Sequence, residues 1–413
     1  MKSGIYVLLS LLMLSLNADA QWLRQTDFAG VAKAKSAAFT IGNKIYVIGG
    51  VDSNSVVRND FWEYDITGDS WIQLPDFPGQ ERYGAATFVL NGKGYIATGA
   101  NDFGYLDDLW EYTPISGTWV QKTGLPLGSA HHDYQRREAF AFVIGTRAYL
   151  GGGEGFVFGA NSTTNVAFYD LWEYNPSTDS WMQKADIPDF TGRNYGIGVA
   201  INNKGYVGLG CDIFFSSNLQ TFWEYDPLAD SWTSKADFPS AFTVDPEAFA
   251  VNGGLYIVGG LRIPATGISS QFYKYDPVAN SWSQLSTFNG GFIVGGIAVS
   301  TGTAAFVGTG YDANLDTRKD LWEFAGATSI EQPYLSSGTV AKIYPNPSGS
   351  FVSIESEMEI SSVEFYDQTG KLIFINKISL KSFNVENLRS GSYIIKLSFT
   401  DGTFQYIHFV KII

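Results

Sequence analysis

The chain has 413 residues, of which 45% are apolar, 15% aromatic and 16% charged, and its formal net charge is −14. So acidic a chain is a poor partner for nucleic acid or for an anionic membrane surface. Its one cysteine, Cys211, excludes an intrachain disulfide and a cysteine-based metal site. The 45 glycines and the many aromatic residues favour short strands joined by tight turns.

Residues 1–20 predict a secretory signal peptide. Lys2 gives a positive start, residues 5–16 are an apolar run, and Ala18-Asp19-Ala20 has the small-x-small pattern of a cleavage site. The apolar run is too short to span a bilayer as a helix. We therefore expect export, a mature chain that starts at Gln21, and no transmembrane segment in that mature chain.

An aromatic segment recurs through residues 21–325 and defines six repeats. The first copy, FWEYDITGDSW at residues 61–71, carries tryptophans nine residues apart, and the sixth, from Leu321, lacks the closing tryptophan. Trp22 supplies the missing residue, so the N-terminal strand is expected to close the last repeat. Four strands per unit at a period near 50 residues predict a propeller blade. The copies between the first and the last begin at Leu109, Leu171, Phe222 and Phe272.

The repeats resemble the kelch motif. Each unit has a run that ends in glycines, such as Ile45-Tyr46-Val47-Ile48-Gly49-Gly50, then the aromatic strand and the spaced tryptophan. The resemblance implies an all-β fold, a six-bladed kelch-type β-propeller at residues 21–325. It says little about function.

A different pattern follows the repeats. Residues 326–341 are small and polar and contain Pro333, which is typical of a linker. Residues 342–413 hold short strand-like runs separated by turn signals and predict a small C-terminal β-sandwich. Their seven Lys and Arg balance seven Asp and Glu, so nearly all of the net charge lies on the repeats.

This tail resembles the C-terminal sorting domain of type IX secretion substrates. The matching segments are YPNP with Gly349 at residues 344–349, DQTGK at 367–371, LRSGSYIIK at 388–396 and FVK at 409–411. The resemblance implies type IX secretion machinery as a partner, and a chain that is secreted or held on the outer cell surface. The alternative is a carbohydrate-binding or adhesive sandwich, although few aromatic residues there suit a sugar platform.

One mouth of the propeller is a candidate site. The first strand of each blade runs near the axis and begins on the face that also carries the loop between strands two and three. Cations at these starts would hold a carboxylate or sulfate, because Arg donates to both oxygens. Alternatively, the basic residues form hydrogen bonds between blades, as is common in kelch repeats. The six starts carry Lys35, Arg82, Arg137, Arg193, Glu247 and Gly291.

The third repeat is longer than the others. Trp119 and Trp181 lie 62 residues apart, against 48 to 51 in the other units, and the excess falls in residues 124–136 and 154–169 on the same face. Long loops on a rigid scaffold often bind ligands. Adjacent histidines on a strand point to opposite faces, and without a third ligand we expect neither metal nor cofactor. The candidate contacts are His131, His132, Tyr134 and Phe156.

These features predict an exported binding protein for glycan or protein at the cell surface. The alternative is a metal-free enzyme on acidic sugars, since the fold resembles the six-bladed sialic acid mutarotases and epimerases. Arg137, Arg193, Glu138 and Glu247 would then supply a cation and carboxylates for acid–base chemistry. The architecture also resembles galactose oxidase, but three histidines and one cysteine do not suit its copper site.

Overall fold

The computed structural model contains strands and turns in two compact units, residues 1–327 and 328–413. Among the residues that it describes there is no helix, and so none that could cross a membrane. The predicted signal peptide lies outside the described residues, as do His131, His132 and Tyr134. The structure describes residues 22–126, 135–158, 163–188, 192–263, 267–325, 341–344, 348, 350–356, 359–367, 372–376, 382–388, 391–400 and 404–411.

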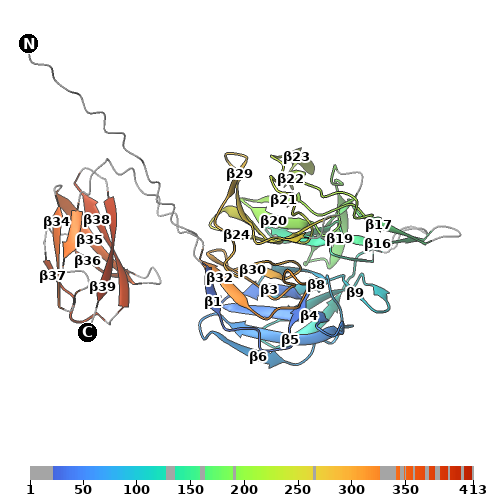
Figure 1. Cartoon of the computed structure of the whole chain (residues 1–413), viewed down its shortest axis with the longest axis horizontal. Helices are drawn as coiled ribbons and strands as arrows, with labels where there is room; N and C mark the ends of the chain where they lie inside the picture. The colour runs from blue at the N-terminus through green and yellow to red at the C-terminus, as the bar shows by residue number, and fades with distance from the viewer. Residues whose placement is uncertain are drawn as a thin grey trace, which may run out of the picture. The chain divides into compact units, whose positions relative to one another are not determined.

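The first unit is a six-bladed propeller, as predicted, and each blade is an antiparallel four-stranded sheet (Figure 1). The first strands neighbour one another in a closed ring around the axis. In blade order, the strands are β3 (Ala37–Ile41), β4 (Lys44–Asp52), β5 (Val57–Asp65) and β6 (Ser70–Leu74); β7 (Ala86–Leu90), β8 (Lys93–Ala97), β11 (Leu109–Thr113) and β12 (Thr118–Lys122); β14 (Phe140–Ile144), β15 (Arg147–Gly151), β18 (Leu171–Asn175) and β19 (Ser180–Lys184); β20 (Ile197–Ile201), β21 (Lys204–Gly208), β22 (Phe222–Asp226) and β23 (Ser231–Ser234); β24 (Glu247–Val251), β25 (Gly254–Val258), β28 (Phe272–Asp276) and β29 (Ser281–Gln284); β30 (Ile297–Ser300), β31 (Ala304–Gly308), β32 (Leu321–Ala325) and β1 (Trp22–Gln25).

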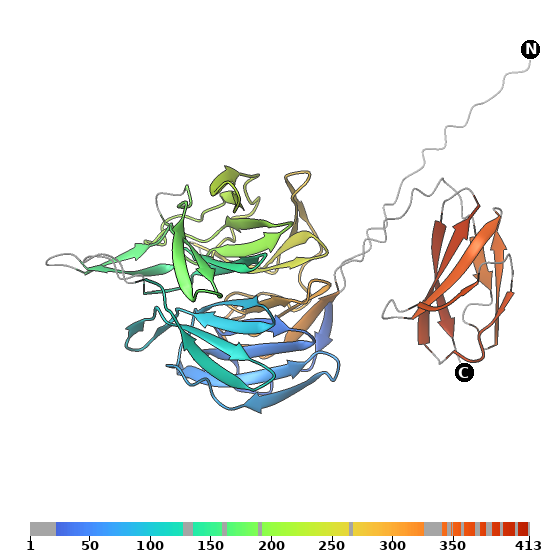
Figure 2. The same cartoon turned by 180° about the vertical axis from the view of Figure 1, so that it is seen from behind.

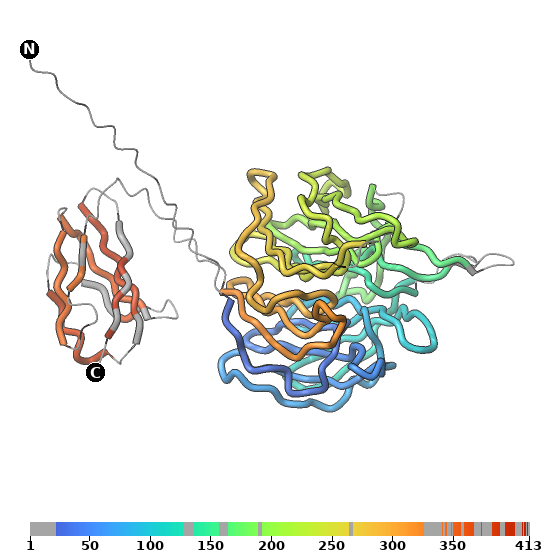
Figure 3. The backbone as a smooth tube through the Cα atoms, viewed as in Figure 1, coloured from blue at the N-terminus to red at the C-terminus, as the bar shows by residue number. Residues whose placement is uncertain are grey.

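The N-terminal strand belongs to the sixth blade. β1 pairs antiparallel with β32, with Trp22 opposite Phe324, and the two strands lie side by side where the blue and orange ends of the ring meet (Figure 3). Trp22 is buried, and its ring centroid lies 4.6 Å from that of Phe288 and 5.3 Å from that of Phe272. A buried aromatic side chain of this size contributes roughly 2–3 kcal/mol by area. The sixth blade therefore gains both its fourth strand and an aromatic anchor from the start of the chain.

A repeated hydrogen-bond set joins neighbouring blades. In the third blade, the Tyr174 hydroxyl donates to Asp179, whose carboxylate accepts the backbone N–H of Thr123 from the second blade. The Trp181 indole N–H then donates to the Thr123 carbonyl at 2.8 Å. The same arrangement recurs around Trp71, Trp232 and Trp282. The closing tryptophan thus ties each of these blades to the blade before it.

Antiparallel order places two kinds of connection on opposite faces. Turns between strands one and two, and between three and four, lie on one face, here called the turn face. Loops between strands two and three, and connections between blades, lie on the other, here called the mouth face. The loop elements β9 and β16–β17 project on the same side of the ring (Figures 1 and 2). The short strands near this face are β2 (Lys33–Ala34), β9 (Ala100–Asn101), β10 (Gly104–Tyr105), β13 (Arg136–Arg137), β16 (Glu154–Phe158), β17 (Thr163–Ala167), β26 (Leu261–Arg262) and β27 (Gly267–Ile268).

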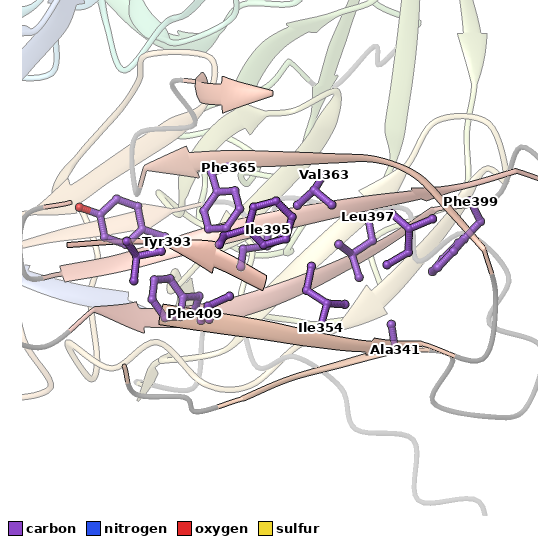
Figure 4. Close-up of a cluster of buried hydrophobic side chains, with 13 residues drawn as sticks. Ala341, Ile354, Val363, Phe365, Tyr393, Ile395, Leu397, Phe399 and Phe409 are labelled. Atoms are coloured by element: carbon purple, nitrogen blue, oxygen red, sulfur yellow. The ribbon is translucent and has the colours of Figure 1, made fainter. Parts of the chain in front are cut away.

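The second unit is the predicted small sandwich. Two sheets share one apolar core, to which Phe365, Ile395 and Phe409 contribute (Figure 4). Alternate residues of its strands are buried, as expected for a sheet with one solvated face. One sheet holds β33 (Ala341–Tyr344), β34 (Phe351–Ser356) and β37 (Ser382–Asn384), and the other holds β36 (Leu372–Asn376), β35 (Ile360–Asp367), β38 (Gly391–Phe399) and β39 (Phe404–Lys411).

Candidate functional site

Six equivalent residues surround the axis on the mouth face, one from each blade, and form what we call the axial ring. All have φ between 55° and 61°, in the left-handed region. Backbone hydrogen bonds join successive members, for example from the Gly84 N–H to the Lys35 carbonyl at 3.0 Å and from the Glu138 N–H to the Gly84 carbonyl at 2.8 Å. The axial ring consists of Lys35, Gly84, Glu138, Tyr195, Asp245 and Gly295.

Two of these positions hold glycine, which adopts this backbone without strain. A residue with a side chain costs roughly 1–2 kcal/mol there, and Asp somewhat less. Lys35, Glu138 and Tyr195 nevertheless occupy it. The two glycines also make room, because a Cβ on Gly84 would lie 2.7 Å from Glu138 Oε1 and one on Gly295 would lie 2.7 Å from Asp245 Oδ2.

The side chains of the ring converge on one cavity of about 150 Å³. Lys35 Nζ lies 3.1 Å from Glu138 Oε1, forms an ion pair with Asp245, and sits 4.1 Å from the centroid of the Tyr195 ring. One ammonium thus bridges two carboxylates over an aromatic face. An ammonium has three donors, whereas two carboxylates offer about eight acceptor positions, so the cavity has acceptors in excess.

Burial sets the proton affinities at this site. It raises the pKa of Asp245 to about 7, although the attraction of Lys35 opposes the shift. Burial and the nearby Asp245 raise the pKa of Glu247 to about 8, while the Gly296 N–H donates to Glu247 Oε1 at 2.6 Å. Burial works against the Lys35 ammonium, but Asp245 and Glu138 outweigh it and raise the pKa of Lys35. The site can therefore hold a proton at neutral pH.

The predicted contact Arg137 lies beside this cavity. Its Nε donates to Glu154 Oε1 at 2.6 Å, and its guanidinium carbon lies 5.2 Å and 5.7 Å from the ring centroids of Tyr83 and Tyr105. Phe156, also predicted, packs on Tyr105 with the ring centroids 4.9 Å apart and remains 37% exposed. The structure thus brings these two predicted residues together in what we call the arginine corner.

Arg82 and Arg193 lie elsewhere than the sequence analysis placed them. Both side chains are buried, at 1% and 0% exposure. Arg82 donates to the Thr98 carbonyl at 3.0 Å and to both oxygens of Asp108, and Arg193 donates to Thr221 Oγ1 at 2.6 Å. A guanidinium so enclosed cannot meet a ligand from solvent, and the expected ring of cations does not form.

The physical reason is a difference in register between the basic residues. Lys33 in the first blade and Arg136 in the third are equivalent to Arg82, since they pair with Asp60 and Asp170 in the same way. We call these buried cations, with Arg82 and Arg193, the basic layer. Lys35 comes two positions after Lys33, and Arg137 one position after Arg136, so both reach the mouth face. Gly291 lies four positions before the ring residue Gly295. The basic layer is therefore structural, but the expected hydrogen bonds between blades are not what its side chains form among the described residues: each cation bonds to residues of its own blade, as Arg82 does to Thr98 and Asp108.

Sequence analysis missed Tyr195 and Asp245. A signal was present, because the equivalent position, which lies two residues after the basic one in the first four repeats, reads Lys, Gly, Glu, Tyr, Asp and Gly in the six repeats. The mixture of glycine and polar residues marks a left-handed position with side chains in four blades. Among the described residues no group of His, Cys, Asp or Glu could hold a metal ion. Cys211 is buried, which raises the pKa of its thiol to about 12.

The mouth face also carries exposed apolar side chains at its loop tips. Phe103 is 88% exposed, Phe214 85% and Leu315 63%. The tips are held by side-chain-to-backbone hydrogen bonds: Asp212 Oδ1, for example, accepts the N–H groups of Phe214 at 2.9 Å and Ser216 at 3.0 Å. Further exposed apolar residues in these loops are Val31, Val56, Phe156, Tyr169, Phe215 and Phe292.

Comparison with known proteins agrees with this architecture. The model of the Attractin/LZTR1 beta-propeller family matches residues 45–322, and that of the secretion system C-terminal sorting domain matches residues 342–411. The predicted kelch-type propeller and sorting tail are thereby confirmed.

Two individual proteins are similar to the propeller. Kelch-like protein 25 from Xenopus tropicalis is 24% identical over 232 residues, which cover 54% of this chain and 36% of that protein. The chain thus spans about a third of that relative's length. The solved structure of YjhT superimposes with a TM-score of 0.61 at 15% identity and covers 74% of this chain and 98% of that one. At this identity the likeness concerns the fold alone.

Proposed function

The chain belongs to the Attractin/LZTR1 beta-propeller family, and we propose that it is an exported binding protein that docks a protein partner on its mouth face. The sorting tail indicates type IX export, to the cell surface or out of the cell. The finer route is part of the proposal: the signal peptide takes the chain across the inner membrane, and the tail then engages the type IX secretion machinery. The propeller is the cargo.

The exposed loop tips carry this proposal. Large apolar side chains in solvent mark interaction surfaces when several gather on one face. Here the loops of five blades contribute them, and most are aromatic, the residue type enriched at the energetic centres of protein interfaces. The turn face exposes mainly the aliphatic residues Ile115, Leu228 and Val278, one per turn. The mouth face is therefore the better docking surface.

The tips are also prearranged. Asp52, Asp212 and Asp312 each accept two backbone N–H groups from the loop that follows, so three blades share one loop conformation. Within it, Phe215 and Leu315 adopt positive φ values of 52° and 64°. Bulky residues pay strain for this backbone, and such strain often accompanies a functional role. A fixed loop loses less entropy on binding than a free one.

A glycan remains the second candidate partner, and the arginine corner favours it. Arg137 between two tyrosine rings, beside the half-exposed Phe156, combines flat apolar faces with a hydrogen-bond donor. An enzyme on acidic sugars has less support. Arg193 is buried, Arg137 is already paired with Glu154, and carboxylates outnumber cations at the axial cavity.

A comparison of the two faces tests the docking proposal. The variant with Phe103→Ser and Phe214→Ser changes the mouth face, and the variant with Ile115→Ser and Leu228→Ser changes equally exposed residues on the turn face. Each full-length protein is produced in its own cells, which are crosslinked intact, and the captured proteins are quantified by mass spectrometry. We expect about a tenfold loss of specific partners for the mouth-face variant alone. Equal capture by both variants would contradict the proposal.

A further inference from the structure

The axial cavity has features that a docking surface for protein does not require. It is recessed, polar, and built from four different side chains that project from one ring of backbone. We propose that this cavity is a saccharide site that binds one neutral sugar unit, with hydroxyl groups donating to Glu138 and Asp245 and accepting from Lys35. The proposal is independent of protein docking at the loop tips.

The axial ring carries side chains at backbone positions where glycine is favoured. Blades two and six show that the fold accepts Gly84 and Gly295 at the ring. Blades one, three, four and five instead hold Lys, Glu, Tyr and Asp at φ values of 55° to 58°. If the ring had only to close the propeller, glycine would serve in all six blades. The strained positions therefore retain their side chains for what those side chains do in the cavity.

The side chains of the cavity offer more hydrogen-bond acceptors than donors. The side chains of Glu138 and Asp245 are 8% and 19% exposed, and both contact the single ammonium of Lys35. Carboxylates shielded from water gain most from a ligand that donates hydrogen bonds, since unsatisfied acceptors in such surroundings are costly. A hydroxyl group donates to a carboxylate and accepts from an ammonium at the same time. Neighbouring hydroxyls of one sugar therefore fit both kinds of group.

The charges around the cavity favour a neutral ligand over a charged one. A cationic ligand would meet the Lys35 ammonium, which already lies between both carboxylates and over the Tyr195 ring. An anionic ligand would meet Glu138 and Asp245 directly, since both side chains line the cavity. The other charged group nearby, Arg137, is paired with Glu154. A neutral polyhydroxyl ligand avoids both conflicts.

The size and shape of the cavity suit a single sugar unit. A volume of about 150 Å³ corresponds to roughly five water molecules, which suits one sugar unit inside the cavity. The Tyr195 ring also lines the cavity, where Lys35 Nζ covers one of its faces, and it contacts Phe215 with the ring centroids 5.7 Å apart. Aromatic faces pack against the apolar side of sugar rings, while the carboxylates take the hydroxyls. The cavity would thus receive the terminal unit of a glycan or a free monosaccharide.

Titration of the full-length protein with single sugars tests this site. The probes are the methyl glycosides of glucose, galactose, mannose and N-acetylglucosamine, with N-acetylneuraminic acid as the acidic comparison, each up to about 10 mM, followed by saturation-transfer NMR and calorimetry. Two variants alter the cavity: Tyr195→Gly, which copies blades two and six, and Glu138→Gln, which keeps the shape and removes the charge. Arg147→Gln, on the turn face, is the matched control.

We expect at least one neutral glycoside to bind, with affinity falling about tenfold or more in both cavity variants and changing less than about twofold in the control. Melting temperatures of the variants show whether each is folded, and if Tyr195→Gly is not, Glu138→Gln alone decides. Three results would overturn the proposal: no neutral glycoside binds, binding survives in Glu138→Gln, or N-acetylneuraminic acid binds more tightly than the neutral sugars. If a glycan bound at the arginine corner instead, its binding would survive in Glu138→Gln, which is the second of these results.

Discussion

The basic layer and the axial ring lie two residues apart in blades one to four, yet they behave in opposite ways. In the basic layer the same contact recurs in blades one to four: a buried cation donates to a backbone carbonyl. The axial ring varies from blade to blade, with Lys35, Tyr195 and Asp245 among its members. Repetition indicates a structural role, whereas variation on a repeated backbone points to a ligand. The four predictions below test this distinction.

The largest effect is expected from deletion of residues 21–26, which removes β1 from the repeated framework. The sixth blade would lose its fourth strand, and the pocket that holds Trp22 among four phenylalanines would open. We expect the free energy of unfolding to fall by about 5 kcal/mol, measured by denaturant titration of the full chain. Leu23→Ala, on the exposed side of the same strand, should cost less than about 1 kcal/mol. Equal losses would show that β1 contributes little to closure.

Arg82→Met breaks one member of the basic layer. The change leaves Asp108 with the Trp110 indole but without the guanidinium that now donates to both of its oxygens. An ion pair with one buried partner removed typically costs 3–5 kcal/mol, and partial exposure of Asp108 reduces this to about 3 kcal/mol. The midpoint of urea unfolding measures the loss. A loss below about 1 kcal/mol would mean that the basic layer is not structural.

Glu247→Gln tests the electrostatics beneath the axial ring through pH. The folded pKa is raised to about 8, above the ordinary value of 4.5, so the folded state keeps a proton that the unfolded state releases. Stability from this group is fully present below about pH 4.5 and is lost as pH rises toward 8. The glutamine variant keeps a side-chain oxygen that accepts the Gly296 N–H, but it has no proton to release, so its stability is not lost in this way as pH rises. It should lie within about 1 kcal/mol of the wild type at pH 5 and exceed it by roughly 4 kcal/mol at pH 8.5. If the difference in stability between the variant and the wild type were the same at both pH values, the raised pKa of Glu247 would be contradicted.

The smallest effect concerns the strain of the axial ring. Tyr195→Ala and Tyr195→Gly both remove the ring that contacts Lys35 and Phe215. They differ only in that glycine accepts a φ of 56° without strain. The glycine variant should therefore be more stable than the alanine variant by about 1 kcal/mol, as thermal unfolding at pH 7 will show. The reverse order would mean that the left-handed backbone is not strained here.

Much of the fold could be predicted from the sequence because its signals are local and repeated. Paired tryptophans nine residues apart mark strands three and four of a blade, and the missing tryptophan after Leu321 pointed to Trp22. The structure confirms this prediction, because Trp22 pairs with Phe324 in the sixth blade. The strands of the sandwich also follow from short apolar runs between turns.

The candidate site was less predictable because it depends on register at the start of each first strand. Lys33, Lys35, Arg136 and Arg137 are all basic, and only three-dimensional structure shows which of each pair is buried. Backbone conformation was equally hidden: nothing in the local sequence of Tyr195 signals a positive φ. Comparison of all six repeats at one position would have indicated it.

The pairing of β1 with β32 has a consequence for the order of folding. The Gln25 side chain donates to Glu323, and the two residues are 298 positions apart. The ring cannot be sealed until nearly all of the propeller has been synthesised, so closure is a late, long-range event. A chain cut short in any blade would leave Trp22 uncovered and two sheet edges open to proteases and to other chains. The join therefore acts as a test of completeness for the propeller, which only a chain that extends through β32 can pass.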